Sequence, residues 1–322
     1  MFRRNLLAFT AVGLSAPSIL RAQSAWPERP IRMVVPFPPG GSSDTYGRIL
    51  QPKLSQALGK PVVIENKGGA SGSMGAAEAA RAAPDGYTWL LAQEQEATNQ
   101  TVMRLPYRVM QAFAPTSLIV TAPLAMVAHK DASWRNMQDL VAAAKRAPDT
   151  IGYATSGIGS LGHVSTALMQ QVGDFKLTHV PYRGAGPALQ DVLSGQVALL
   201  VTSVVNVSKH IKGGALKPLG VTTLEETPML PGVKSLAQQG FAEFEALGWL
   251  VLLGRAGTPE PVIRKMSEAM SQVLVDAEVR QRIAELGGDV VGGGPERCRR
   301  FVNNEVTKWG RVIRDNNITL ES

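Results

Sequence analysis

Two glycine-rich loops, one in each half of the chain, limit the possible folds more than any other feature of the sequence. The first loop, PFPPGGSSD at residues 36–44, follows an apolar, β-branched run and precedes apolar residues at helical spacing. The second loop, ATSGIGSLGH at residues 154–163, also lies between a strand-like run and residues at helical spacing. Alternating strand, loop and helix predict a parallel sheet with right-handed crossovers, and the restart of the pattern in mid-chain predicts two α/β domains.

The periodicity of the apolar residues places the expected elements. We expect strands at residues 31–36, 62–64, 87–92, 124–128, 150–154, 177–182 and 197–201. We expect helices near residues 43–58, 76–83, 136–146, 164–169, 187–193, 259–286 and 295–315. Ser43 and Asp44 supply capping chemistry for the first helix, Pro52 should kink it, and the helical region of residues 259–286 should break near Asp276.

The first residues have the layout of a secretory signal. Arg3 and Arg4 precede an apolar stretch, and small residues follow at Ala22 and Ala25. The stretch is shorter than the roughly 20 apolar residues that a membrane span needs. We therefore expect residues 1–24 to be a cleaved signal peptide and the mature protein to be periplasmic.

Charge and cysteine content exclude several functions. Removing Arg3, Arg4 and Arg21 from the formal net charge of +7 leaves +4, and the remaining cations are dispersed, so no nucleic-acid partner is expected. Cys298 is the only cysteine, and the four histidines lack the spacing of metal ligands, so neither a metal nor a cofactor is expected. Hydrophobic residues make up 44% of the chain, which is enough for a folded core.

The two loops are better suited to an anion than to a nucleotide or an ester. The segment at residues 157–162 matches GxGxxG, but no acidic residue follows about 20 positions on to bind a ribose. Neither loop ends in the Gly-Lys-Ser/Thr of a P-loop, and no GxSxG elbow is present. Each loop joins the carboxyl end of a strand to a helix start, where free N–H groups and the helix dipole favour an anion.

A set of motifs in a fixed order resembles the tripartite tricarboxylate transporter substrate-binding receptors, or Bug-type proteins. The resemblance covers nearly the whole mature chain, and its motifs are VVPFPPGGSSD (34–44), VVIENKGGASGSMG (62–75), AAPDGYT (82–88), IGYATSGIGSLGH (151–163), HVPYRG (179–184), LSGQV (193–197) and AGTP (256–259). It implies a two-lobed α/β periplasmic-binding-protein (Venus-flytrap, type II) fold with two chain crossovers. Lobe 1 would comprise residues 25–124 and 247–322, and lobe 2 residues 125–246.

The same resemblance implies a non-enzymatic receptor, expected to be monomeric. It would capture a small carboxylate between the lobes and deliver it to a two-component membrane permease. A periplasmic enzyme or a ligand-sensing protein that uses the same cleft is the alternative.

Candidate ligand contacts come from the loops and strand ends. Backbone and hydroxyl donors are expected near Gly41 and Ser156, Arg183 is a counter-charge for a second carboxylate, and Phe37 could form an apolar wall. Asp44 either meets the ligand or only organises its loop. The full set is Phe37, Gly40, Gly41, Ser42, Asp44, Gln93, Thr155, Ser156, Gly157, Ser160, His163, Tyr182 and Arg183. We also hypothesise that Glu94 or Glu96 contacts an amine or hydroxyl of the ligand.

Overall fold

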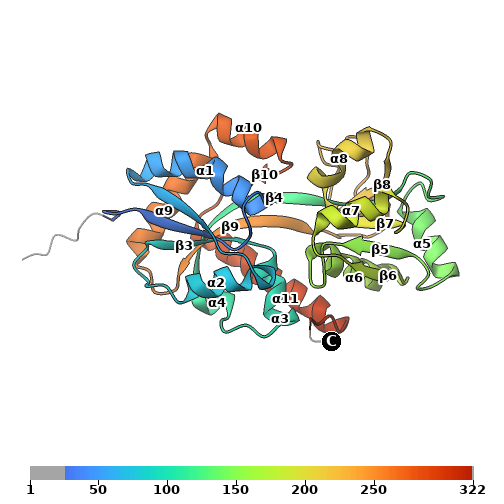
Figure 1. Ribbon diagram of the computed structural model, residues 1–322, viewed down its shortest axis with the longest axis horizontal. Helices are drawn as coiled ribbons and strands as arrows, with labels where there is room; N and C mark the ends of the chain where they lie inside the picture. The colour runs from blue at the N-terminus through green and yellow to red at the C-terminus, as the bar shows by residue number, and fades with distance from the viewer. Residues whose placement is uncertain (1–25, 321–322) are drawn as a thin grey trace, which may run out of the picture.

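The computed structural model describes residues 26–320. The predicted signal peptide, residues 1–24, and its cleavage site lie outside this range. The described chain forms two α/β lobes joined by extended strands, as Figure 1 shows. No helix among residues 26–320 has both the length and the apolarity needed to cross a membrane.

The first lobe is built on a sheet in which three parallel strands are followed by an antiparallel one. Its strands, in spatial order, are β2 (Val62–Asn66), β1 (Ile31–Val35), β3 (Thr88–Gln93), β9 (Leu247–Arg255) and β4 (Phe113–His129), and β10 (Asp289–Val290) pairs with β4. Successive side chains point to opposite faces: Met33 packs under one set of helices and Val34 under the other. The first set is α1 (Ser42–Leu58), α9 (Glu260–Leu274) and α10 (Ala277–Glu285), and the second is α2 (Ser73–Ala80), α3 (Gln95–Val102), α4 (Val109–Ala112) and α11 (Pro295–Asp315).

The second lobe repeats this plan. The carboxyl-terminal part of β4 pairs with β7 (Leu199–Ser203) and β8 (Leu216–Val221), and β5 (Gly152–Thr155) and β6 (Thr178–Pro181) continue the sheet beyond β7. Helices α5 (Met137–Arg146) and α6 (Leu161–Gly173) cover one face, and α7 (Ala185–Leu193) and α8 (Val204–Lys212) cover the other. Two short 3₁₀ turns, Ala70–Gly72 and Ala237–Gln239, complete the described elements.

Strand β4 belongs to both sheets. Its first part, from Phe113 to Pro123, pairs with β9, and its second part, from Leu124 to His129, pairs with β7 and β8. Its 17 residues exceed the usual length of about 3–10. The sequence predicted only residues 124–128 of it, because Pro115 and the polar residues that follow interrupt the apolar run. Register shifts near these residues let the ladder with β9 continue.

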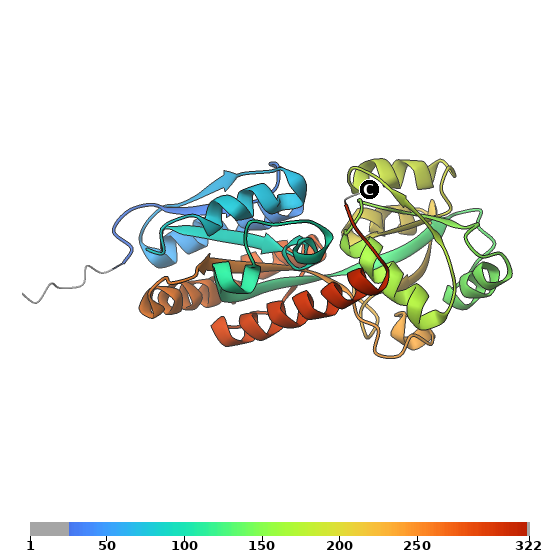
Figure 2. The same ribbon diagram turned by 90° about the horizontal axis from the view of Figure 1, so that it is seen from below.

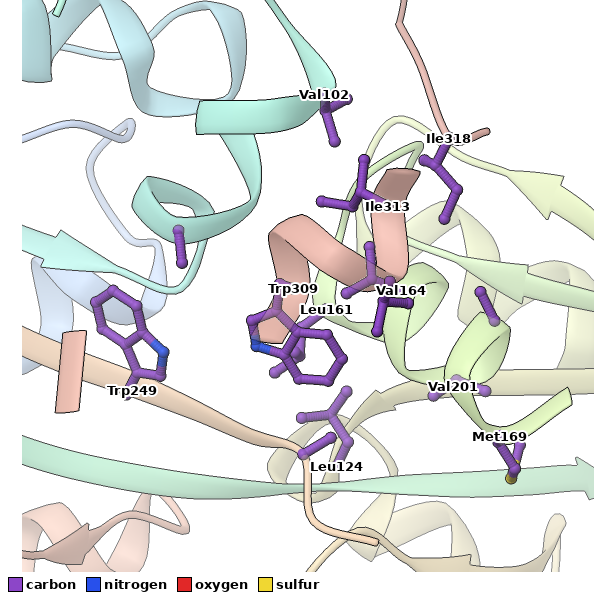
Figure 3. Packing of buried hydrophobic residues seen from close by; sticks show 14 of the residues in the cluster. Val102, Leu124, Leu161, Val164, Met169, Val201, Trp249, Trp309, Ile313 and Ile318 are labelled. Atoms are coloured by element: carbon purple, nitrogen blue, oxygen red, sulfur yellow. The ribbon is translucent and has the colours of Figure 1, made fainter. Parts of the chain in front are cut away.

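Helix α11 ties the two lobes together from one side, as Figure 2 shows. Its bounds agree with the predicted residues 295–315. Its Trp309 is fully buried and lies close to Leu161 of α6 and Leu124 of β4 (Figure 3). One apolar cluster therefore extends from the first lobe into the second.

One local prediction for α1 was wrong. Its N-cap is Gly41 and no side chain caps it, so Ser43 and Asp44 lie inside the first turn. The helix continues through Pro52 to Leu58, and the kink at Pro52 stays a prediction. The predicted break near Asp276 is confirmed, because α9 ends just before Asp276 and the Asp276 side chain caps α10.

We predict that Gly75→Ala lowers the free energy of unfolding by about 1–3 kcal/mol. A methyl group at Gly75 would lie 2.5 Å from the Lys67 carbonyl oxygen and 3.0 Å from Pro36 Cα, so α2 would have to move away from its neighbours. Urea unfolding of the purified protein measures the change.

The matched control is Gly186→Ala, also within a helix, where no heavy atom beyond its chain neighbours and its own helix backbone lies within 4 Å of the added carbon. It should raise stability by up to about 1 kcal/mol through helix propensity. Equal midpoints for the two variants would contradict the role assigned to Gly75.

Candidate functional site

A cavity of about 480 Å³ lies between the two lobes. Its floor comes from the two crossing strands, through residues such as Ala122 of β4 and Gly248 of β9. Its walls come from the segments that follow β1, β3, β5 and β7, which is where parallel α/β sheets bind ligands. The lining residues are Gly40, Gly41, Ser42, Thr45, Tyr46, Gln93, Glu94, Gln95, Val120, Ala122, Leu124, Ser156, Leu161, Gly162, Ala185, Val201, Thr202, Ser203, Val205, Asn206, Gly248, Trp249, Leu250 and Leu286.

Four helices begin at this cavity. Ser42 of α1, Leu161 of α6, Ala185 of α7 and Val205 of α8 belong to the first turns of their helices, and all four line it. The first N–H groups of a helix have no partner within the helix and carry partial positive charge. None of the lining residues is Lys, Arg or His. The lining therefore offers an anion backbone N–H groups and neutral polar side chains, and no cationic side chain.

The first loop is held by a carboxylate that does not line the cavity. The buried Asp44 accepts hydrogen bonds from the Gly40 N–H at 2.9 Å, Asn66 Nδ2 at 3.0 Å and Arg48 Nε at 3.0 Å. The bond from Arg48 is the main reason why the pKa of Asp44 is lowered. The structure thus gives Asp44 the loop-organising role, which was one of its two expected roles.

Gln93 joins this loop to the strand beside it. Its Nε2 donates to Ser42 Oγ at 2.9 Å, and both residues line the cavity. Of the predicted contacts, the structure brings together at the cavity Gly40, Gly41, Ser42, Gln93 and Ser156.

The second loop is organised largely by its own hydrogen bonds. Ser160 caps α6 by accepting from the His163 N–H, and its hydroxyl donates to the Gly157 carbonyl at 2.7 Å. Thr155 Oγ1 lies 2.7 Å from His179 Nε2. Thr155, Gly157, Ser160 and His163 therefore support the loop, and none of them lines the cavity.

The remaining three predicted contacts also lie outside the cavity lining. Tyr182 donates to Asp191 Oδ2 at 2.6 Å, and this bond is the main reason why its pKa is raised to about 12. Arg183 is exposed and makes no hydrogen bond or ion pair with residues 26–320. The half-buried Phe37 packs toward Gly72. As ligand contacts, these three residues stay predictions.

Sequence reasoning missed the contribution of β7 and α8. Thr202, Ser203 and Asn206 line the cavity, and Asn206 Nδ2 donates to Thr202 Oγ1 at 2.9 Å. The rule applied to the glycine-rich loops would have found them, because Ser203 follows the predicted strand of residues 197–201. They were missed because the segment has no glycine that would indicate a close approach of the backbone to a ligand.

The two glutamates after β3 have different surroundings. Glu94 lines the cavity, whereas Glu96 is buried in the core, where Tyr107 Oη donates to its Oε2 at 2.9 Å. Burial raises the pKa of Glu96 to about 7. Only Glu94 is placed to meet a ligand.

His163 and His179 stack with ring centroids 3.7 Å apart, and burial lowers their pKa values to about 3 and about 4. At these two residues the unfolded chain therefore binds more protons than the native protein below about pH 6.5. We predict that the histidine pair lowers stability as pH falls from about 6.5 to 4, by up to about 1.4 kcal/mol per pH unit for each histidine. The raised pKa values of Glu94, Glu96 and Glu305 act in the opposite sense over the same range.

Urea midpoints at about pH 7 and pH 5 measure the net change in stability, and the histidine contribution is the difference between the wild type and a variant without the pair. The variant that combines His163→Asn and His179→Gln should be distinctly less destabilised by the lower pH than the wild type, because the other titrating groups are unchanged. The same change in both proteins would rule out a contribution from the histidine pair.

Known proteins are similar to this chain in sequence and in fold. The sequence profile of the tripartite tricarboxylate transporter family receptor, TctC, matches residues 47–318. The structure is similar to that of Rpa4515 from R. palustris with adipate, with a TM-score of 0.81 and 30% identity over 92% of this chain and 100% of the other. It is also similar to MatC from Rhodopseudomonas palustris with bound malate (TM-score 0.77, 30% identity, 89% and 100% coverage) and to the periplasmic binding protein BugD (0.77, 32%, 91% and 99%).

Proposed function

The chain belongs to the tripartite tricarboxylate transporter receptor family, and we propose that its cavity captures a small carboxylate for a two-component membrane permease. The family is one of solute-binding transport receptors and not of enzymes. Relatives with the same fold have been solved with adipate and with malate, both small carboxylates.

The observation that carries the proposal is the convergence of four helix starts on a cavity without a cationic side chain. Backbone N–H groups and helix dipoles stabilise an anion, and they act more strongly in a site that excludes water. The volume of about 480 Å³ suits a small acid accompanied by bridging waters. An uncharged ligand would leave these donors poorly matched.

The lobes supply the means of capture. We propose that lobe 1 comprises residues 25–124 and 247–322 and lobe 2 residues 125–246, with a hinge where β4 and β9 cross between them. Ser42 and Ala185 line the cavity from different lobes, so a ligand bound to both favours the closed state over the open one. In the same proposal the protein is a monomer of the periplasm, from which residues 1–24 have been removed.

The proposal is tested by a thermal-shift screen of the mature protein, freed of co-purified ligand. Mono-, di- and tricarboxylates are compared with their uncharged amides. A ligand at 100 times its Kd stabilises the native state by about 2.7 kcal/mol, so at least one acid should raise the Tm clearly and its amide should not. If no carboxylate shifts the Tm, the proposed ligand class is wrong.

A charge placed in the cavity gives a sharper prediction. Ala185→Asp puts a carboxylate among the lining residues, while Asp in a first helical turn leaves the fold intact or slightly stabilised. We expect the affinity for the best carboxylate of the screen to fall by about tenfold or more, measured by calorimetry.

Gly186→Asp is the control, because it makes the same charge change one residue further on, at a position that is exposed and does not line the cavity. Its affinity should stay within about threefold of wild type, since solvent screens an exposed charge. Equal losses in both variants would argue against a ligand at the start of α7.

A further inference from the structure

Glu94 is the only Asp, Glu, Lys, Arg or His among the residues that line the cavity. Resting on the proposed function, we propose that Glu94 is a specificity-determining residue that selects small carboxylic acids which also carry an ammonium group. The acid group would lie at the helix starts and the ammonium group at Glu94.

The carboxylate of Glu94 has only weak partners within residues 26–320. Its Oε2 accepts from the backbone N–H of Trp249 at 3.3 Å, and its Oε1 accepts from Gln95 Nε2, also at 3.3 Å. The backbone N–H of Glu94 itself also favours the charged form. All three donors are neutral, and no Lys, Arg or His of the described chain forms a hydrogen bond or an ion pair with the carboxylate. A carboxylate offers about four acceptor sites, so several stay open.

A neighbouring acceptor points to the same kind of ligand. Gln95 lines the cavity beside Glu94, and because its amide nitrogen donates to Glu94, its Oε1 is left buried without a hydrogen-bond partner in the described structure. Two adjacent side chains thus present acceptor oxygens without strong donors. An ammonium group has three N–H donors and a positive charge, which suits both.

The other titratable groups near Glu94 do not neutralise it. Tyr46 of α1 also lines the cavity, and burial raises its pKa to about 12, so it stays uncharged. Glu305 of α11 is an acid, and it acts with burial to raise the pKa of Glu94. A buried carboxylate without a cation is costly, and a ligand that brings the cation removes that cost.

A protonated Glu94 that donates to a plain dicarboxylate is the competing arrangement. Burial raises the pKa of Glu94, which favours this arrangement while the cavity is empty. The protonated carboxyl would, however, supply one donor hydrogen to a site that already has two poorly satisfied acceptors. An ammonium group supplies three N–H donors and a positive charge that lowers the pKa of Glu94, so it suits these acceptors better.

The test uses series of acids that differ at one substituent. Succinate, malate and aspartate share a four-carbon diacid and carry hydrogen, hydroxyl or ammonium at the same carbon. Glutarate, 2-hydroxyglutarate and glutamate form a longer series, and propionate, lactate and alanine a monoacid series. For at least one series we expect calorimetry to give a Kd for the ammonium member about tenfold or more below that of the unsubstituted acid.

Glu94→Gln should raise the Kd of that ammonium member by about tenfold or more and leave the unsubstituted acid unchanged or bound more tightly. Glu94→Ala should behave in the same way, which covers the case in which the amide disturbs the loop. Glu96→Gln is the matched control, because Glu96 is two residues away and does not line the cavity; its series should match the wild type.

The pH dependence separates the two arrangements. Between about pH 5 and pH 8, affinity for the ammonium member should rise or stay level as Glu94 loses its proton. A protonated Glu94 would instead make the affinity for the unsubstituted acid fall as pH rises, and that result would overturn the proposal. The proposal would also be overturned if the carboxylates bind with equal affinity whether or not they carry an ammonium group. If no acid of any series binds, the proposed function itself fails.

Discussion

The architecture depends on a strand whose backbone hydrogen bonds are shared between two sheets. The first part of β4 is fixed by β9, and the second part by β7 and β8, so neither lobe can complete its sheet without this strand. The switch of partners falls between Pro123 and Leu124, next to the cavity residues Ala122 and Leu124. The floor of the cavity is therefore also the connection between the lobes, and any change of lobe angle must act on it.

Four buried or half-buried carboxylates of residues 26–320 have different kinds of hydrogen-bond partner. Asp44 has an arginine and two N–H donors, and Glu96 has the hydroxyl of Tyr107. Glu305 receives the indole N–H groups of Trp249 and Trp309 at 3.0 and 2.8 Å. Glu94 has two long bonds from neutral donors. Three of these acids are explained by the fold, and the fourth is the one that lines the cavity.

The sequence predicted the elements whose apolar residues recur at a regular spacing and the loops that Gly and Pro mark. Helix α11 was found because its apolar residues recur at helical spacing, and both glycine-rich loops were found because Gly and Pro mark them. The first part of β4 was missed because prolines and hydroxyl side chains break its apolar run, although tertiary pairing keeps it extended. Helix α3 was missed because its buried face is polar, with Glu96 and Asn99 satisfied by partners distant in the chain.

The residues of the candidate site could likewise be predicted only in part. Ser42 and Ser156 could be predicted because the sequence alone shows that each lies in a loop that follows a strand. Both residues line the cavity. Thr155 and Ser160 have the same residue types, yet their hydroxyl groups serve the loop itself. Which way a hydroxyl points depends on neighbours such as His179, which come from other parts of the chain.

The shared acceptor at Glu305 has an optical consequence. Trp249 forms part of the cavity wall, Trp309 belongs to the core between the lobes, and one carboxylate holds the indole nitrogens of both. A shift of the Trp249 ring alters the hydrogen bond and the local field at both chromophores. Two of the five tryptophans in the chain are thus coupled to the cavity, and their ultraviolet emission would respond together, without any added label, when it fills.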